Sequence, residues 1–171
     1  MEKLVLIDGH SILNRAFYGV PNLTNSEGLH TNAVYGFLNI LFKVLDEEKA
    51  DYLAVAFDLK APTFRHKMFD AYKGTRKPMP EELHEQVPLM KEVLTAMGVP
   101  ILTKEGYEAD DILGTIAKRE QKDGYEVTIL SGDRDLLQLS DTHIRICLPK
   151  TSRGTTEVHN YYPEDVIREY Q

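Results

Sequence analysis

Aspartates follow three separate apolar runs of this sequence, each at the point where a strand would end. The runs are Leu4–Ile7, Tyr52–Phe57 and Val127–Leu130, and the acids that follow them are Asp8, Asp58, Asp133 and Asp135. Two bare carboxylates about 4 Å apart repel each other by about 4 kcal/mol at an effective dielectric constant of about 20, so their clustering adds no stability. A bound cation relieves that repulsion. If the three strands are neighbours, the pattern therefore predicts a metal site.

A second group of acids precedes a predicted helix. Glu108, Asp110 and Asp111 come directly before Ile112–Ala117, whose apolar spacing is helical. Acids in a first helical turn also stabilise the helix through its dipole, by about 0.3–1 kcal/mol each. That explanation accounts for one or two acids more easily than for three. Any single aspartate after a strand is equally well explained as a turn or cap residue, whereas the whole set favours a metal site.

The elements that must position these acids alternate between strand and helix. Strands are predicted at Met1–Asp8, Tyr52–Asp58, Val99–Thr103 and from Val127, and a hairpin from Ile144–Leu148 and Thr156–His159. Helices are predicted at Ser11–Tyr18, Thr31–Glu48 (capped by Thr31 or Asn32), Pro80–Met97 (bent at Pro88), between Glu108 and Gly124, and from Tyr162. This order predicts one α/β domain over residues 1–171, with a mostly parallel central sheet flanked by helices. Parallel strands bring their carboxyl ends to one edge, where such sheets bind ligands.

Charge is unevenly distributed along the sequence. The formal net charge is −7, yet residues 60–77 carry six Lys or Arg against one acid. We interpret residues about 60–80, which also contain Phe64, Phe69 and Tyr72, as a basic excursion from the sheet. A basic stripe beside an acidic cluster is typical of a metal-dependent nuclease, because cations hold phosphates while acids hold the metal.

Composition also bears on location. Cys147 is the only cysteine, so no internal disulfide can form, and a reducing compartment fits. The first apolar run stops at Asp8, too early for a signal sequence, and no segment approaches the roughly 20 apolar residues of a membrane span. We therefore expect a monomeric cytoplasmic protein with no membrane partner.

Five ordered motifs carry a resemblance to a known family. They are Leu6–Ser11, Ala56–Asp58 with Thr63–Arg65, Tyr72–Arg76, Tyr107–Asp111 and Ser131–Asp135. Together they closely resemble the 5′-nuclease domain at the N-terminus of bacterial DNA polymerase I, a relative of flap endonucleases and of the wider PIN-like fold. The resemblance spans essentially the whole chain. It implies 5′→3′ exonuclease activity and structure-specific endonuclease activity on DNA with 5′ flaps or single-stranded 5′ ends.

The resemblance also implies a role for each acid. Asp8, Asp58, Glu108 and Asp110 match the residues around a first metal ion, and Asp133 and Asp135, with Asp111 nearby, match those around a second. Ligation by oxygen alone suits Mg²⁺ or Mn²⁺ rather than zinc. Two such ions about 3.5–4 Å apart would activate the attacking water and stabilise the leaving 3′-oxygen.

In the family, the basic excursion corresponds to a helical arch that admits a single-stranded 5′ end. Lys73 and Arg76 match arch cations that act on the reacting phosphate, and Arg15 matches a residue lining the active site. The further residues expected to bind DNA are Arg65, Lys67, Tyr72 and Lys77. The alternatives are a solvated basic face for the cations and packing beneath the arch for Tyr72. His10 is interpreted as structural, because no other zinc-type ligand lies at a suitable spacing beside it.

The sequence departs from the family pattern at its C-terminal end. In the family the chain continues into further metal-binding aspartates and a helix–turn–helix element that grips duplex DNA, and neither follows Gln171 here. We therefore expect a truncated form of a longer protein, with a covalently linked polymerase domain in the full-length version. The second metal site should be incomplete and the activity impaired.

Three other functions were weighed against the nuclease. A PIN-type ribonuclease would share the sheet and the acids but act on RNA, and the long basic insertion argues against it. A non-catalytic nucleic-acid-binding fragment gains weight from the missing C-terminal part. A haloacid-dehalogenase-like phosphatase is discarded, since its first strand should end in two aspartates one residue apart, whereas Gly9 and His10 follow Asp8.

Overall fold

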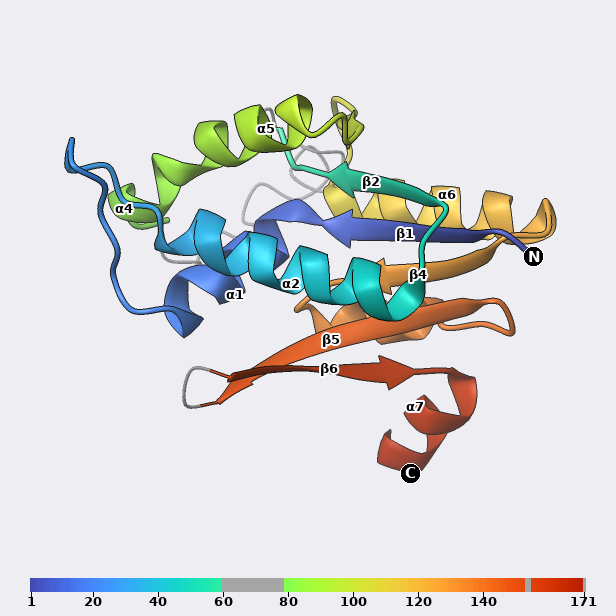
Figure 1. The fold of residues 1–171 in the computed structure, drawn as a ribbon. Coiled ribbons are helices and arrows are strands. Elements are labelled where there is room, and N and C mark those ends of the chain that lie inside the picture. Colours follow the sequence, from blue (N-terminus) through green and yellow to red (C-terminus); the bar gives the residue numbers. More distant parts are fainter. Residues whose placement is uncertain (60–78, 153–154, 171) are drawn as a thin grey trace.

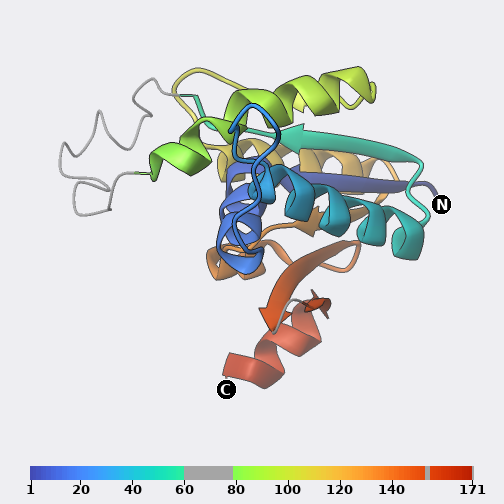
Figure 2. The same ribbon diagram turned by 60° about the vertical axis from the view of Figure 1, so that its left-hand side comes forward.

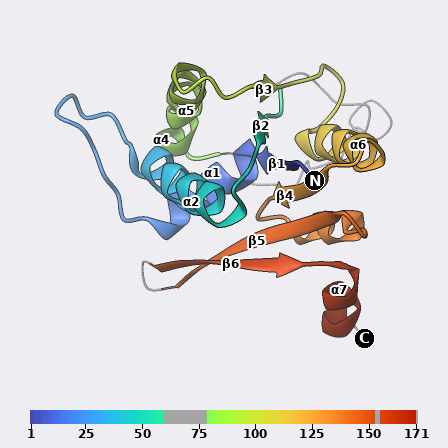
Figure 3. The same cartoon turned by 45° about the vertical axis from the view of Figure 1, so that its right-hand side comes forward.

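A single mixed sheet forms the centre of the computed structural model, which describes residues 1–59, 79–152 and 155–170. Its strands are β1 (Lys3–Asp8), β2 (Tyr52–Ala56), β3 (Ile101–Leu102), β4 (Glu126–Leu130), β5 (Ile144–Ser152) and β6 (Thr155–Tyr161). They lie in the order β3-β2-β1-β4-β5-β6, which Figure 1 labels from β2 onward and Figure 3 labels in full. Every pairing from β3 to β5 is parallel, and β6 runs antiparallel to β5. The predicted α/β fold with a mostly parallel sheet is confirmed, as is the predicted hairpin.

The apolar runs become strands that are buried on both faces. Val5 and Ile7 point into one core cluster and Leu6 into the other, so β1 has no solvent-facing side. Parallel sheets covered on both faces select such continuous apolar runs. Because β1 lies between β2 and β4, the three strand ends that aspartates follow are neighbours in space.

Helices cover the sheet on two sides. The helices α1 (Gly9–Gly19), α2 (Asn32–Glu48), α4 (Glu81–His84) and α5 (Gln86–Ala96) lie on one side, and α6 (Ala109–Lys122) lies on the other (Figure 3). The 3₁₀ helix η1 (Arg134–Leu139) packs on the same core cluster as α6. The last helix, α7 (Pro163–Tyr170), lies beyond the β5–β6 hairpin, at the end of the molecule away from α5 (Figure 2).

The helix predicted at Pro80–Met97 is two helices. It breaks at Glu85, and α5 begins at Gln86, which places Pro88 in the first turn of α5. Proline has no N–H to donate to the carbonyl four residues earlier, so the chain restarts the helix before it instead of bending through it. The strand predicted at Val99–Thr103 is also shorter, because only Ile101 and Leu102 pair with β2.

The start of α2 is capped by a residue from α5. Thr31 occupies the cap position but makes no side-chain capping bond. Instead, the buried side chain of Gln86 accepts hydrogen bonds from the backbone N–H groups of Ala33 and Val34, at 2.8 and 3.1 Å. Its amide nitrogen donates to Asn32 Oδ1 at 2.9 Å. Helix N–H groups without a local partner thus find one from a distant segment.

The predicted basic arch falls outside the residues that the structure describes. The chain is described up to Leu59 and again from Met79, just before α4. The residues predicted there to bind DNA or act on phosphate are Arg65, Lys67, Tyr72, Lys73, Arg76 and Lys77. Their roles therefore stay predictions. Within the described part of the chain, none of the helices has the length and apolar character that crossing a bilayer requires.

Candidate metal centre

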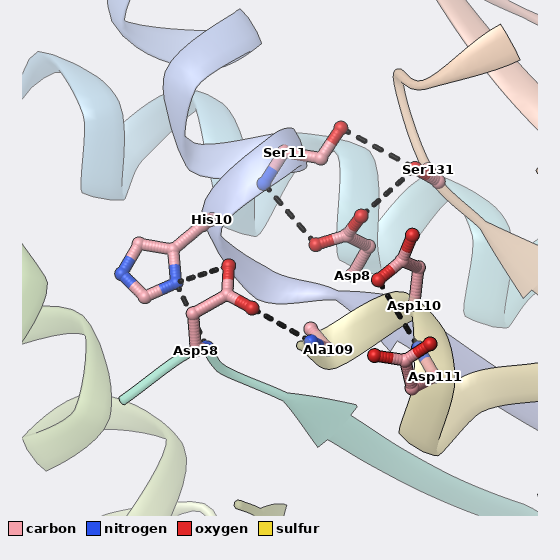
Figure 4. Close-up of polar contacts among 8 residues, drawn as sticks. All are labelled: Asp8, His10, Ser11, Asp58, Ala109, Asp110, Asp111 and Ser131. Atoms are coloured by element: carbon pink, nitrogen blue, oxygen red, sulfur yellow. Dashed lines mark hydrogen bonds and ion pairs between the residues drawn. The ribbon is translucent and has the colours of Figure 1, made fainter. Parts of the chain in front are cut away.

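Acidic side chains from three elements meet at the carboxyl edge of the sheet. Asp8 is the last residue of β1, Asp58 follows β2, and Asp110 lies in the first turn of α6. Figure 4 shows these carboxylates gathered beside the start of α1. Asp58 and Asp110 follow Asp8 by 50 and 102 positions in the sequence. They come close to it because β1 and β2 are parallel neighbours and α6 packs against both.

Asp8 is the most perturbed acid of the group. Only 8% of its surface is exposed. Burial, and then the negative charge of Asp58 and of Asp110, raises the pKa of Asp8 to about 7, despite the opposing hydrogen bonds from Ser11 and Ser131. Ser11 N–H donates to Oδ1 at 3.4 Å, and Ser131 Oγ donates to Oδ2 at 3.1 Å. A carboxylate held this way among other acids is a site where a cation can replace a proton.

Asp58 is fixed by groups on both sides. Its Oδ1 accepts a hydrogen bond from Ala109 N–H at 2.6 Å, which joins the end of β2 to the start of α6. Its own N–H lies 3.2 Å from His10 Nδ1, and the same ring nitrogen lies 3.7 Å from Asp58 Oδ2. Burial lowers the pKa of His10, and the charge of Lys91 lowers it further, against the opposing effect of Asp58. This geometry fits a structural role for His10.

The three acids of α6 combine capping with a metal-sized cluster. Glu108, Asp110 and Asp111 each offer a carboxylate oxygen within 4.8 Å of the others. Asp111 also performs the helix-capping role, since its Oδ2 accepts a hydrogen bond from Glu108 N–H at 3.0 Å. Asp110 Oδ1 accepts a hydrogen bond from Asp111 N–H at 3.1 Å, and the charge of Asp110 contributes to the raised pKa of Asp8. The reciprocal capping box therefore explains Glu108 and Asp111 but not Asp110, and the oxygen-only donor set of the three acids fits Mg²⁺ or Mn²⁺.

Asp133 and Asp135 lie on the turn after β4 and are more exposed than Asp8. Asp133 caps η1 by accepting a hydrogen bond from Asp135 N–H at 2.9 Å. The link to the first cluster is Ser131, whose Oγ accepts a hydrogen bond from Asp133 N–H at 3.0 Å and contacts Asp8. The metal-sized group found among the described residues consists of Glu108, Asp110 and Asp111, so it contains none of Asp8, Asp58, Asp133 and Asp135.

Comparison with known proteins assigns the chain to a family. The family model described as the 5′-3′ exonuclease, N-terminal resolvase-like domain, matches residues 3–171. The chain belongs to this family. It is 49% identical to the DNA polymerase I of Bacillus caldotenax and 48% identical to that of Bacillus subtilis, over 169 residues in each case. These alignments cover 99% of the chain but 19% of each relative, so the chain spans about a fifth of the curated relatives it matches.

Solved structures show the same fold for this exonuclease-family domain. A zinc-bound bacteriophage T5 5′-exonuclease matches with a TM-score of 0.73 and 23% identity, covering 99% of the chain and 61% of the relative. A T5 flap endonuclease crystallised with DNA and metal ions matches with a TM-score of 0.72 and 22% identity, over 99% and 61% of the two chains. The resemblance to the 5′-nuclease domain of bacterial DNA polymerase I is therefore confirmed.

Three residues of this exonuclease-family domain emerge only from the structure. Ser11 and Ser131 hold the acidic site by hydrogen bonds, although both lie within motifs noted for their acids. Lys91, on α5, lies with its Nζ 5.1 Å from the centre of the Phe57 ring, next to His10. Nothing in the sequence distinguishes Lys91 from an ordinary solvent-exposed lysine. By contrast, the position of Ser131 directly after an apolar strand is a pattern that predicts a residue at the acidic site.

Proposed function

We propose that residues 1–171 form one PIN-like 5′-nuclease domain that hydrolyses phosphodiester bonds of DNA with two divalent ions, Mg²⁺ or Mn²⁺. The observation that carries this proposal is that Asp58 and Asp110 lie close to the buried carboxyl group of Asp8 and help to raise its pKa to about 7. Three elements contribute these carboxylates, and such a cluster of charge is costly to assemble unless the charge is used.

The acids divide between two ions. Asp8, Asp58, Glu108 and Asp110 would hold the first, and Asp133 and Asp135, with Asp111, would contribute to the second. When bound, such ions supply an activated water and stabilise charge on the leaving oxygen. Support comes from the all-carboxylate donor set and from the metal ions named with the T5 relatives.

Groups of the chain itself keep this site in order. Ser11 and Ser131 orient the two oxygens of Asp8, and Ala109 N–H orients Asp58. Because these donors stabilise the ionised carboxylates, they favour exchange of the Asp8 proton for a cation near neutral pH. The phosphate to be cleaved would lie at the open edge of the sheet, beyond the strand ends.

The proposed substrate is DNA with a 5′ flap or a single-stranded 5′ end. It rests on family membership and on the T5 flap endonuclease that was crystallised with DNA. Lys73 and Arg76 would act on the reacting phosphate, with Arg65, Lys67, Tyr72 and Lys77 as further DNA contacts. A polymerase region in the same polypeptide, a monomeric state and a cytoplasmic location remain part of the proposal, because the relatives are bacterial DNA polymerases I.

Two measurements on the chain test the proposal. Calorimetric titration with Mn²⁺ should detect binding that Asp8→Asn and Asp110→Asn abolish and that Asp46→Asn, at an exposed acid on α2, leaves unchanged. Cleavage of labelled 5′-flap DNA and of single-stranded RNA is then compared with and without Mn²⁺. We expect slow, Mn²⁺-dependent cleavage of the flap.

Each alternative function has its own outcome. Cleavage of RNA in preference to flap DNA would indicate a PIN-type ribonuclease. Binding of DNA without any Mn²⁺ binding would indicate a non-catalytic fragment, and it would remove the metal mechanism altogether.

A further inference from the structure

Helix α1 binds both backbone polar groups of one residue, Gly132, in the turn after β4. Ser11 Oγ accepts a hydrogen bond from Gly132 N–H at 2.7 Å, and Arg15 Nη2 donates to Gly132 O at 3.2 Å. Ser11 and Arg15 are four residues apart on α1, so they lie on the same face one turn apart. The backbone of Gly132, 117 residues from Arg15 in the sequence, is thus hydrogen-bonded by α1 at both its N–H and its C=O.

We propose that Ser11 and Arg15 form a clamp that positions Asp133, the next residue in the chain, relative to Asp8. As far as Asp133 is a metal ligand, this inference rests on the proposed function. The clamp makes Ser11 and Arg15 positioning residues of the acidic site. It gives Arg15 a role inside the protein, in addition to the active-site role that the family resemblance implies.

Ser131 completes the connection between the clamp and the acids. It is fully buried, and its Oγ contacts Asp8 Oδ2 at 3.1 Å and Ser11 Oγ at 3.3 Å while accepting from Asp133 N–H. A hydroxyl has one proton to donate, so with Asp8 ionised the Ser131 proton points to Asp8. Groups from β1 and α1 therefore hold the turn at Ser131 and Gly132, and Ser131 in turn holds the backbone of Asp133.

The absence of a side chain at Gly132 is what lets the clamp close. A Cβ at this position would lie 2.8 Å from Arg15 Nε and 3.0 Å from Ser11 Oγ. Gly132 is not among the described glycines with positive φ, so an alanine there meets no backbone strain. Gly132→Ala is therefore a specific steric probe of the clamp.

The clamp predicts the opposite sign from a purely electrostatic role of Arg15. Removing a cation from beside a group of carboxylates should strengthen their affinity for Mn²⁺, because a competing positive charge is gone. Removing a clamp should weaken that affinity, because Asp133 is no longer held toward the site. Loss of groups that orient metal ligands costs about 10–100-fold in metal affinity.

The experiment follows backbone amide signals by NMR in the chain during titration with Mg²⁺, which is diamagnetic and shifts the signals of groups close to it. In the unmodified chain we expect shifts at both Asp58 and Asp133. In Ser11→Ala, Arg15→Ala and Gly132→Ala, the half-maximal shift at Asp133 should require about tenfold more Mg²⁺, with Asp58 changed less than twofold. Ser11→Thr, which keeps the hydroxyl, should restore the normal value.

Amide hydrogen exchange without metal tests the clamp separately. Exchange at Gly132 and Asp133 should accelerate at least tenfold in Ser11→Ala and Arg15→Ala, while Ile129 in β4 stays protected. Thr128→Val, which removes another buried hydroxyl on β4, and Arg119→Ala, which removes an exposed arginine on α6, should change neither measurement.

Failure of the clamp and failure of the proposed function give different results. Mg²⁺-dependent shifts at neither Asp58 nor Asp133 in the unmodified chain would contradict the metal site, and hydrogen exchange would still decide the clamp. Shifts at Asp58 alone, unchanged exchange in the variants, or tighter Mg²⁺ binding in Arg15→Ala would each overturn the inference.

Discussion

The hydroxyl of Ser131 lies 3.1 Å from Oδ2 of Asp8, and this contact joins the ends of two neighbouring strands. Both residues are buried, with 0% and 8% of their surfaces exposed. Ser131 thus supplies one of the few hydrogen bonds that favour the charged form of an acid whose pKa burial has raised. The chemistry proposed for this edge of the sheet depends on that balance.

Removing the Ser131 hydroxyl should shift the balance toward protonated Asp8. In Ser131→Ala, we expect the pKa of Asp8 to rise further and Mn²⁺ affinity to fall about tenfold, because the carboxylate loses a donor. Calorimetry at pH 7 measures the affinity. Thr128→Val serves as the control, since it removes a buried hydroxyl that contacts Glu48 and Arg145 and none of the acids of the candidate metal site. Equal affinities in Ser131→Ala and the unmodified chain would contradict the role assigned to Ser131.

Asp8 should make the metal-free protein less stable as the pH rises. Its pKa is about 7 in the folded chain against 3.8 as the ordinary value. Between these values the folded chain binds more protons than the unfolded chain, so stability falls as the pH rises through this window. At 1.36 kcal/mol per pKa unit, the loss is at most about 4 kcal/mol.

The variant Asp8→Asn isolates this effect. Urea unfolding in EDTA should show it to be more stable than the unmodified chain at pH 8 and similar at pH 4, whereas excess Mn²⁺ at pH 8 should reverse the order. Asp46→Asn, at an exposed position, should follow the unmodified chain throughout. A pH-independent difference between Asp8→Asn and the unmodified chain would rule out the raised pKa.

Two glycine substitutions should have opposite effects on stability. A Cβ at Gly9 would lie 2.6–2.8 Å from the buried ring of Phe57, so Gly9→Ala should lower the free energy of unfolding by about 1–3 kcal/mol. At Gly114, on α6, the nearest atom is 3.4 Å away, and alanine should add up to about 1 kcal/mol through helix propensity. Denaturant melts of the two variants provide the comparison, and equal effects would show that the Phe57 contact does not constrain Gly9.

The basic segment is tested by the salt dependence of DNA binding. Lys73→Ala and Arg76→Ala should each weaken binding to a 5′ single strand and reduce the slope of log K against log salt by about 0.7 per lost phosphate contact. Fluorescence anisotropy between 50 and 200 mM salt, a range in which such contacts show clearly, gives the slope. Arg168→Ala, at an exposed arginine on α7, loses the same charge and should leave the slope unchanged. Slopes that match in all variants would remove Lys73 and Arg76 from the DNA contact.

The parts of the structure that could be predicted are those set by local pattern. Apolar runs such as Leu4–Ile7 predict strands buried on both faces, and parallel neighbours bring Asp8 and Asp58 to one edge without further information. The parts that could not be predicted depend on contacts between distant residues. Ser131 and Ser11 meet across 120 positions, and no periodicity in either segment records that distance.

Local patterns also failed where two influences compete. Pro88 predicts a bend within one helix, but α4 ends at His84 and a new helix begins at Gln86, with Glu85 between them. Likewise, Thr31 has the residue type of a cap and the position of a cap, yet the capping bonds come from Gln86. At α2 a tertiary partner decided between local alternatives, whereas the break before α5 follows from the N–H that Pro88 lacks.

The buried amide of Gln86 has a practical consequence for exchanging parts between related nucleases. This residue follows the basic segment in the chain, yet it seals the beginning of α2, which precedes that segment. A chimaera that takes the basic segment together with the following helices from a relative would also replace Gln86, the residue that caps α2. Swaps should therefore be cut after Leu59 and before Glu81, or should carry Asn32 and Gln86 as an inseparable pair.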